Sequence, residues 1–298
     1  MNYCLGTVQF GMSYGIQGNG QPDVDSVEKM LEYAYANGIE ILDTAAAYGD
    51  AENILGRILC RNKNLSKFNI VSKLAPNAFD NIDSCEWRKA AVQKAEKSRQ
   101  ILGVPKLHSF LFHNASYIFN SQAVDALQAV CDRGIADRIG VSIYTPDEAM
   151  KALEYKSIKA IQIPYNVFDC RLDRCGFFEK AKEQDVVIFA RSSLLQGLVM
   201  MDPDRLPENV RFAENYLRTF LKICDRYHCS PLEAAVGYVG CNPKIDYVVF
   251  GVDNPQQLQE YLSLQRRSMP PAMFEDVRAS FKDTEEKLVN PTMWGKGR

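Results

Sequence analysis

The sequence predicts an α/β barrel of the (β/α)8, or TIM-barrel, class, and three observations support this prediction. Eight short apolar runs are distributed along the chain, and a polar stretch with helical spacing follows nearly every one of them. The runs are continuously apolar, as strands are when both faces of a sheet are buried. An open doubly wound sheet is the alternative, but no Gly-x-Gly-x-x-Gly motif follows the first run.

The elements can be assigned in chain order. The stretches 25–38 and 121–134 place apolar residues three or four apart and end in glycine, which is typical of amphipathic helices with a left-handed C-terminal stop. The longest gap between runs, 191–245, contains helical patterns near 209–227 and 230–240, so one extra helix is expected there. The eight predicted strands are 3–8, 39–42, 68–72, 108–112, 138–143, 158–163, 186–190 and 246–250.

The chain after the eighth predicted strand carries a further helical pattern near 271–287. No internal repeat or low-complexity linker marks a domain boundary, and α/β barrels routinely reach this length as one domain. Residues 1–298 are therefore expected to form a single (β/α)8 barrel with extra helices after the seventh strand and at the C-terminus.

The charge balance argues against several classes of partner. The chain has 35 Lys and Arg residues against 37 Asp and Glu residues, and no dense basic block suggests binding to nucleic acid. The N-terminus lacks a basic segment followed by an apolar run, and no window approaches the ~18 apolar residues that a membrane span needs. We expect a cytoplasmic protein without a membrane or nucleic-acid partner, and the sequence gives no indication of oligomeric state.

Nine cysteines require a decision between disulfides, metal ligands and free thiols. Their number is odd, no Cys-x-x-Cys motif occurs, and His228 alone lies beside a close pair, Cys224 and Cys229. A zinc site needs four such ligands. Reduced thiols and no metal site are therefore expected.

Four polar side chains come at or just after the ends of three consecutive predicted strands. Asp43 and Tyr48 follow the second strand, Lys73 lies near the end of the third, and His113 follows the fourth. The C-terminal ends of barrel strands meet at one rim, so these side chains are expected to converge there. Taken singly, each would more often be a surface or structural residue, but their joint placement favours a site.

The four residues have a chemical logic together. A free tyrosine has a pKa near 10 and is a poor acid, but an ammonium such as that of Lys73 stabilises the phenolate and lowers that pKa. Asp43 would keep the lysine charged and oriented, and His113 could hydrogen-bond a substrate oxygen. Tyr48 could then donate a proton as negative charge develops on that oxygen. The pattern predicts carbonyl reduction.

Several segments resemble the aldo-keto reductases, in particular the bacterial-type members. The resemblance rests on "LGTVQFG", "DTAAAYG", "SKL" and "LFHN", and it extends through "DRGIADRIGVS" to "FGVDNPQQLQE" over nearly the whole chain. It implies a (β/α)8 barrel that reduces aldehydes or ketones with a nicotinamide cofactor. It also implies that Asp43, Tyr48, Lys73 and His113 are the catalytic residues, with Tyr48 as the general acid.

The resemblance further implies a set of cofactor contacts. Ser142 and Gln162 match positions that bind the nicotinamide carboxamide, 192–197 matches the loop over the diphosphate, and 251–257 matches the adenosine end. Backbone amides could serve the phosphates in these loops. The implied cofactor residues are Thr7, Asp43, Ser142, Gln162, Arg191, Ser192, Leu194, Gln196, Gly197, Gly251, Val252, Asp253 and Gln257.

The chain departs from the family pattern at the cofactor positions. Ile143 replaces a common asparagine, and Arg191 replaces a common stacking aromatic. Gly251 and Gln257 stand where many members have Lys and Arg around the adenosine 2′-phosphate. NADPH is the expected cofactor, with NADH as the alternative that these last two positions leave open.

Two other functions compete with the reductase. A regulatory or scaffold protein, similar to the family's ion-channel β-subunits, could bind the cofactor on the same barrel. A lyase or isomerase could use Lys73 as a Schiff-base amine, although Asp43 would keep that lysine charged. The segment "ARSSLLQGL" resembles members of bacterial sugar metabolism, so a sugar or sugar derivative is the expected carbonyl substrate. The residues expected to wall its pocket are Phe10, Tyr14, Tyr117, Phe168 and Trp294.

Overall fold

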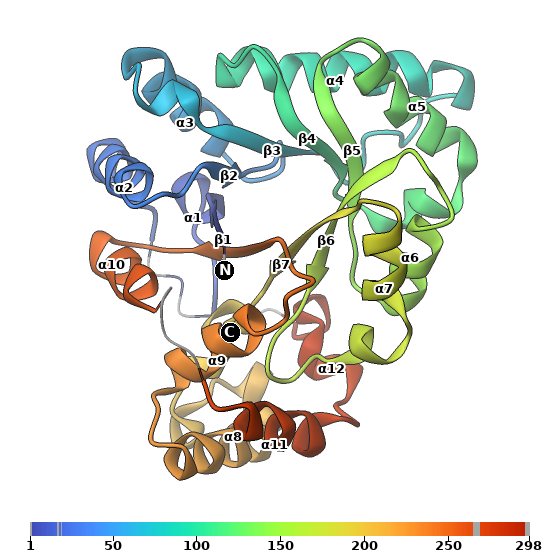
Figure 1. Cartoon of the computed structure of the whole chain (residues 1–298). Coiled ribbons are helices and arrows are strands. Elements are labelled where there is room, and N and C mark those ends of the chain that lie inside the picture. The colour runs from blue at the N-terminus through green and yellow to red at the C-terminus, as the bar shows by residue number, and fades with distance from the viewer. Residues whose placement is uncertain (1, 17, 19, 265–268, 296–298) are drawn as a thin grey trace.

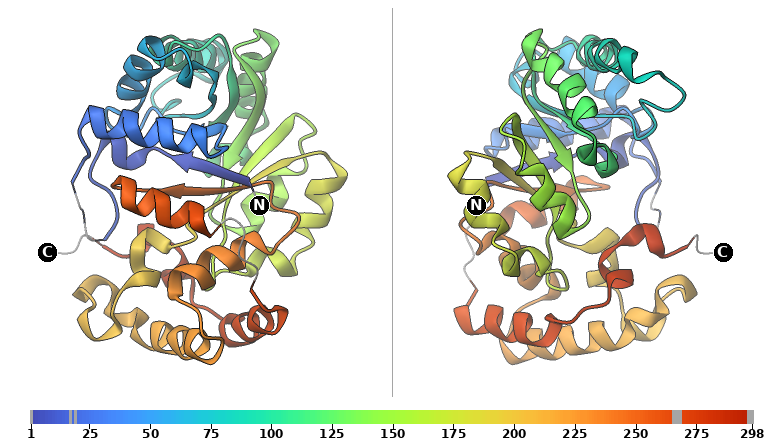
Figure 2. Two further views of the ribbon diagram at one scale, coloured as in Figure 1. Left: turned by 60° about the vertical axis from the view of Figure 1, so that its left-hand side comes forward. Right: turned by 90° about the vertical axis from the view of Figure 1, so that its right-hand side faces the viewer.

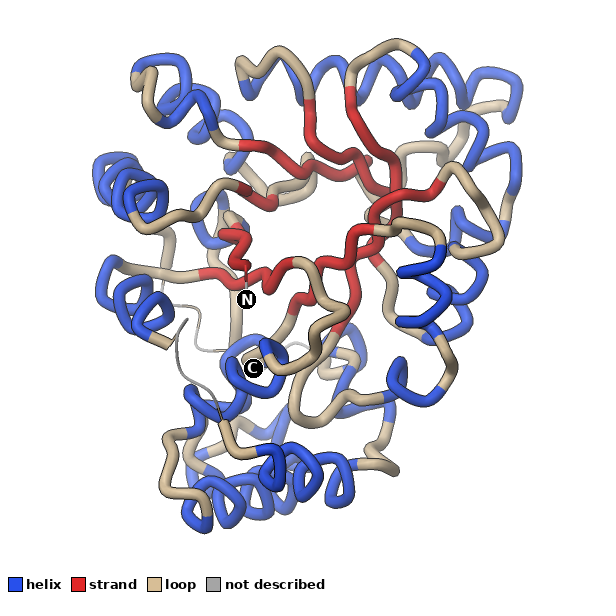
Figure 3. Tube along the Cα trace, in the orientation of Figure 1, coloured by secondary structure: helices blue, strands red, loops and turns tan. Residues whose placement is uncertain are grey.

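Eight parallel strands close into a barrel in which each strand pairs with its neighbours in chain order and the eighth pairs with the first. The computed structural model describes residues 2–16, 18, 20–264 and 269–295. Figure 3 shows the strands as a ring surrounded by helices, and this arrangement confirms the predicted (β/α)8 barrel. The strands are β1 (Asn2–Gly6), β2 (Ile41–Asp43), β3 (Asn69–Leu74), β4 (Leu107–Phe112), β5 (Ala136–Ser142), β6 (Ile158–Pro164), β7 (Val187–Arg191) and β8 (Tyr247–Gly251).

The helices cover the outside of this ring (Figure 1). The two that the sequence places after the seventh strand and beyond the eighth, α8 and α11, pack beside each other on one side of the barrel (Figures 1 and 2). Within the described residues, every helix is too short or too polar to cross a lipid bilayer. The helices are α1 (Val8–Gly11), α2 (Val24–Ala36), α3 (Ala51–Arg61), α4 (Trp87–Leu102), α5 (Ser121–Asp132), α6 (Pro146–Ala152), α7 (Phe177–Glu183), α8 (Glu214–Arg226), α9 (Pro231–Gly240), α10 (Pro255–Ser263), α11 (Pro271–Phe281) and α12 (Glu286–Val289).

Some predicted boundaries are wrong. The helical pattern near 209–227 begins as a 3₁₀ helix, Glu208–Ala213, before α8 starts. The pattern near 271–287 divides into α11 and α12, because Thr284 turns its hydroxyl back onto the carbonyl of Phe281 at 2.8 Å and ends the first helix. The second strand is Ile41–Asp43 rather than 39–42, so it starts two residues later than predicted and ends on Asp43.

Reciprocal capping bonds close the starts of two helices, α6 and α9. At α6, the Thr145 hydroxyl accepts the backbone N–H of Glu148, and the Glu148 carboxylate accepts the backbone N–H of Thr145. Ser230 and Glu233 form the same reciprocal pair at α9. Each pair satisfies two N–H groups that a helix terminus would otherwise leave without a partner. The capping bonds therefore fix the N-terminal ends of α6 and α9.

An apolar layer fills the interior of the barrel. Its members come from seven of the eight strands, and each is at most 7% exposed. At β5 the corresponding place is taken by Gly140, where a side chain would collide with the carbonyl of Ala160. The interior is therefore a packed core rather than a channel. The layer consists of Cys4, Ile41, Val71, Leu111, Ala160, Phe189 and Val249.

Gly56 marks the closest approach between α3 and the end of α4. A Cβ at Gly56 would lie 1.9 Å from the carbonyl oxygen of Ile101, which is backbone and cannot move aside. We expect Gly56→Ala to lower the free energy of unfolding by about 3 kcal/mol or more, measured by urea denaturation.

Gly237 in α9 provides the matched control. A Cβ there would meet only the flexible side chain of Met269, at 2.6 Å, and alanine favours a helix over glycine by about 1 kcal/mol. Gly237→Ala should therefore stay within about 1 kcal/mol of the parent. Equal losses in the two variants would contradict the backbone contact at Gly56.

Candidate active site

The candidate site lies one layer above the apolar interior, because side chains two residues apart on a strand point to the same face. Asp43 comes two residues after Ile41, and Lys73 comes two residues after Val71. The same step leads from interior residues to His113, Ser142, Gln162, Arg191 and Gly251. The strands that build the core thereby deliver these residues together to the C-terminal rim.

Lys73 is the centre of the polar cluster. Its side chain is fully buried, and its ammonium donates to both carboxylate oxygens of Asp43 at 2.7 and 2.8 Å and to the carbonyl of Thr44 at 2.9 Å. A further bond of 3.3 Å joins Lys73 Nζ to the hydroxyl of Tyr48. The Gln162 side chain also donates to Asp43 Oδ1 at 2.8 Å. The predicted pairing of Asp43, Lys73 and Tyr48 is therefore present.

The charge on Lys73 is well supported. Burial opposes it, but Asp43 and Tyr48 outweigh the burial and raise the pKa of Lys73 above its usual value. The amine therefore stays protonated at neutral pH. A protonated amine has no lone pair for attack on a carbonyl, which argues against the Schiff-base alternative.

The pKa of Tyr48 shifts in the direction opposite to the sequence-based expectation. Burial raises the pKa of Tyr48 above its ordinary value, and the lowering by Lys73 does not overcome that effect; Asp43 raises it further. The loss of water around a phenolate thus outweighs one nearby ammonium. Tyr48 is a neutral phenol at neutral pH, so it carries a proton that it can donate.

His113 lies edge-on against the Tyr48 ring, with 5.5 Å between ring centroids. Burial, together with the charges of Lys73 and Arg191, lowers the pKa of His113 to about 3. The imidazole is therefore neutral and carries one N–H. Its Nδ1 is buried and has no hydrogen-bond partner among the described residues.

A cavity of about 500 Å³ opens in front of this cluster, a size typical of small-molecule sites. Asp43, Tyr48 and His113 line it, as do all thirteen residues that the sequence assigned to a cofactor. Lys73 does not line the cavity but lies buried behind Asp43 and Tyr48. It can therefore act on a bound molecule only through those two residues.

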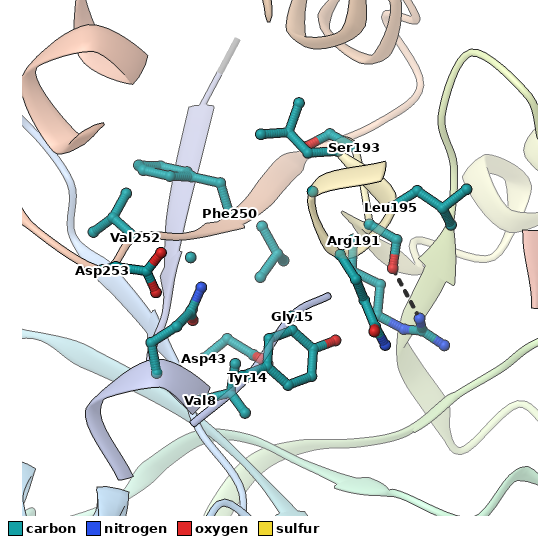
Figure 4. Close-up of a pocket in the computed structure, with 18 of the residues that line it drawn as sticks. Val8, Tyr14, Gly15, Asp43, Arg191, Ser193, Leu195, Phe250, Val252 and Asp253 are labelled. Carbon is teal, nitrogen blue, oxygen red and sulfur yellow. Dashed lines mark hydrogen bonds between the residues drawn. The ribbon is translucent and has the colours of Figure 1, made fainter. Parts of the chain in front are cut away.

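The prediction that five aromatic residues line the substrate pocket is wrong for four of them. Tyr14 lines the cavity (Figure 4), but the other four predicted aromatic residues do not. Phe10, Phe168 and Trp294 are at most 5% exposed and pack in the core. The Tyr117 hydroxyl accepts the backbone N–H of Phe79 at 3.2 Å, which keeps this ring with its neighbours Phe79 and Phe112.

Arg191 and Tyr144 make a contact in the site that was not predicted from the sequence. The guanidinium of Arg191 lies 4.5 Å from the centroid of the Tyr144 ring. It donates to the Ser142 hydroxyl at 3.4 Å and to the carbonyl of Ile143 at 3.0 Å. Tyr144 was missed in the sequence, although its position directly after the predicted fifth strand was a usable signal.

The loop after β7 has an unusual backbone. Ser192, Leu195 and Gln196 have positive φ angles of 65°, 48° and 56°, and Gly197 has one of 90°. Non-glycine residues adopt such angles at a cost, which surrounding structure must offset. Here the carbonyl of Gln196 accepts the backbone N–H of Ile16 at 3.2 Å. The loops after β1 and β7 are therefore tied together at the edge of the cavity.

The far end of the cavity is formed by β8 and the start of α10. The side chain of Gln9 occupies the space beside Gly251, where any Cβ would collide with its amide. The Gln257 amide accepts the backbone N–H of Asp253 at 2.8 Å. Figure 4 shows Asp253 and Val252 across the cavity from Arg191. The cavity thus extends from the Tyr48 cluster to a second polar end.

All nine cysteines are free thiols, and the pair Cys224 and Cys229 forms no disulfide. In the described part of the chain, no group of three or more His, Cys, Asp or Glu side chains is placed to hold a metal ion.

A closed barrel with a buried Lys–Asp pair behind a tyrosine, at the wall of a cavity, is the arrangement that the resemblance to the aldo-keto reductases implies. The aldo/keto reductase family model matches residues 2–281. The chain therefore belongs to the aldo/keto reductase family, as the sequence resemblance predicted, and it is an NAD(P)H-dependent oxidoreductase.

Known proteins similar to this chain agree with that assignment. The oxidoreductase sirO of Leptosphaeria maculans is 21% identical over an alignment of 293 residues that covers 87% of this chain and 86% of sirO. The solved glycerol dehydrogenase of Gluconobacter oxydans superimposes with a TM-score of 0.73 at 22% identity, covering 97% of this chain and 94% of that one. The holo form of an aldo-keto reductase from Bacillus halodurans gives 0.73 at 15% identity, covering 97% and 92%. At these identities the solved structures support the fold alone.

The described residues fit a nicotinamide dinucleotide. Gln162 and Ser142 present an amide and a hydroxyl at the end of the cavity near Asp43, and Gln9 Oε1 is a buried acceptor without a hydrogen-bond partner among the described residues. Buried polar atoms of this kind normally have a partner. A polar ligand lying along the cavity would supply one.

Proposed function

We propose that this enzyme reduces an aldehyde or ketone to an alcohol, with Tyr48 as the general acid. The observation that carries the proposal is the bond between Tyr48 and the buried ammonium of Lys73 at the wall of the cavity. The bound nicotinamide cofactor supplies the hydride when it is present. The family resemblance favours NADPH as that cofactor, with NADH as the alternative.

The residues of this chain account for the proton. A carbonyl oxygen gains negative charge as its carbon is reduced, and Tyr48 gives its proton to that oxygen. Lys73 then stabilises the tyrosinate across the 3.3 Å contact, while Asp43 holds the ammonium in position. The tyrosinate regains a proton from solvent after the alcohol leaves, so no net charge remains.

His113 orients the carbonyl. Its pKa near 3 keeps the imidazole neutral, so it can donate one hydrogen bond to the carbonyl oxygen without competing for the proton. His113 and Tyr48 both line the cavity, and the edge-on contact between their rings supports a shared role at one carbonyl oxygen. Two hydrogen-bond donors at one oxygen stabilise the negative charge that develops on it as the carbonyl carbon is reduced.

A sugar or sugar derivative is the proposed substrate class. The proposal rests on the resemblance of 190–198 to members that act in sugar metabolism. The mixed lining of the cavity supports it, because Tyr14 and Tyr144 offer aromatic surface beside the polar Ser192 and Gln196. Such surfaces suit a molecule with both C–H faces and hydroxyl groups.

A fluorescence titration with NADH and with NADPH, followed by cofactor oxidation with a panel of small and sugar aldehydes, tests the proposal. We expect binding of a reduced cofactor and turnover of at least one sugar aldehyde. Binding without turnover across the panel would favour the regulatory alternative. No binding to either cofactor would overturn the proposed function.

A further inference from the structure

Three sulfur atoms gather outside the cavity, where α8, the turn after it and α11 meet. Cys224, in the last turn of α8, is 2% exposed, and Met273, in the first turn of α11, is 1% exposed. Cys229, in the turn between α8 and α9, is half-buried, and its Sγ lies 3.7 Å from Met273 Sδ. Figures 1 and 2 show α8 and α11 side by side. Packing of the two helices therefore brings soft sulfur atoms together from separate parts of the chain.

The turn after α8 folds Cys229 back toward Cys224. His228 has a positive φ of 52°, and a residue other than glycine adopts such an angle at a cost. The backbone N–H of Cys229 donates to the carbonyl oxygen of Cys224 at 3.1 Å, and the Cys229 thiol lies 3.7 Å from that oxygen. Burial, together with the neighbouring Cys229 thiol, raises the pKa of the Cys224 thiol to about 12. The two thiols therefore lie close enough to influence each other.

The protonation of the two cysteines limits their chemistry. Both are free thiols, and burial raises the pKa of each. They are therefore mostly protonated at neutral pH, and a protonated thiol is a poor nucleophile toward peroxides or disulfides. A metal ion does not require a preformed thiolate, because its charge displaces the proton as the bond to sulfur forms. The cluster is therefore better suited to a metal ion than to oxidation.

The kind of ligand determines which ion fits. Thiolate and thioether sulfur is soft and selects Cu(I), whereas zinc is held by four ligands from Cys, His, Asp or Glu. In the described part of the chain, no group of three or more such side chains is placed for a metal ion, so an ion here needs the thioether of Met273. Three sulfur atoms about 2.3 Å from one ion lie about 4 Å apart. The 3.7 Å between Cys229 Sγ and Met273 Sδ is close to that separation.

We propose that Cys224, Cys229 and Met273 bind one Cu(I) ion. As the ion binds, the S–H bonds of both cysteines break, two thiolate–copper bonds form, and two protons pass to solvent. Met273 gives a lone pair of its thioether to the same ion. The oxidation state of copper does not change, so the step needs no oxidant or reductant. The site lies outside the cavity and is independent of the proposed carbonyl reduction. The expectation of free thiols without a metal site considers zinc ligands alone.

Anaerobic titration of the full chain with Cu(I), in competition with the Cu(I) chelator bathocuproine disulfonate, provides the test. We expect the chain to retain one equivalent of Cu(I) against the chelator and to release two protons for each ion bound. Bound Cu(I) should also raise the midpoint of thermal unfolding, because a ligand that binds the folded chain stabilises it. Complete loss of Cu(I) to the chelator, or its displacement by Zn(II), would overturn the inference.

Variants identify the ligands. Cys229→Ser should lose the retained Cu(I), and Met273→Leu, which keeps a similar apolar volume in the core, should weaken Cu(I) binding by at least about tenfold. Cys60→Ser removes an exposed thiol of α3 and should keep the parent affinity. Thermal unfolding without copper checks that each variant is folded. Parent-like Cu(I) binding by Cys229→Ser or by Met273→Leu would show that this cluster does not hold the ion.

Discussion

Replacing Tyr48 with phenylalanine is expected to lower kcat for carbonyl reduction by about a thousandfold, within the range for loss of a general acid. The substitution removes the hydroxyl group that donates a proton to the carbonyl oxygen. The ring and its edge-on contact with His113 remain. Cofactor affinity and the free energy of unfolding should therefore stay close to those of the parent.

Tyr14 supplies the control for this experiment. Its ring also lines the cavity and is 39% exposed, but no bond joins its hydroxyl to Lys73. Tyr14→Phe should reduce kcat by less than about tenfold. Steady-state rates for the two variants, with the dissociation constant of the cofactor measured in parallel, make the comparison. If Tyr48→Phe turned over substrate as fast as the parent enzyme, Tyr48 would not be the general acid.

Replacing Lys73 with methionine is expected to cost both stability and activity. Lys73 is fully buried and holds the Asp43 carboxylate with two short bonds. Without it, Asp43 keeps the Gln162 amide but loses its counter-ion. Removal of one partner of a buried pair typically lowers the free energy of unfolding by about 3–5 kcal/mol. The tyrosinate also loses its ammonium, so kcat should fall by at least about a hundredfold.

The double variant Asp43→Asn with Lys73→Met separates the two losses. It removes the uncompensated charge, so urea denaturation should show most of the lost stability restored. The ammonium beside Tyr48 is still absent, so kcat should stay low. Recovery of activity along with stability would mean that Lys73 serves only the fold.

The fold was predictable because its signals are local. Apolar runs such as 158–163 and helical patterns such as 121–134 depend on residues close together in the chain. The convergence of Asp43 and His113 was also predictable, since parallel strands bring their ends to one rim. The residues that the family resemblance implies as cofactor contacts all line the cavity, and their role in binding a cofactor stays a prediction.

The features that the sequence could not predict depend on contacts between residues that are far apart in the chain. The raised pKa of Tyr48 reflects a competition between burial and Lys73 whose outcome requires the packed site. Phe168 lies in a predicted rim loop and Trp294 in the C-terminal tail, but the side chains of both are buried. The pairing of Arg191 with Tyr144 joins the end of β7 to the loop after β5, which are far apart in the chain. Only the closed barrel brings these groups into contact.

The apolar layer beneath the site also has a consequence for the proposed proton transfer by Tyr48. Residues such as Ile41, Leu111 and Phe189 seal the barrel directly below Asp43, His113 and Arg191, and they offer no chain of polar groups for a proton to follow. In the proposed reaction, Tyr48 therefore regains its proton from the side of the cavity. The carbonyl compound, the alcohol product and the proton that restores Tyr48 would then all pass through the mouth of the cavity. Reprotonation of Tyr48 would follow departure of the alcohol.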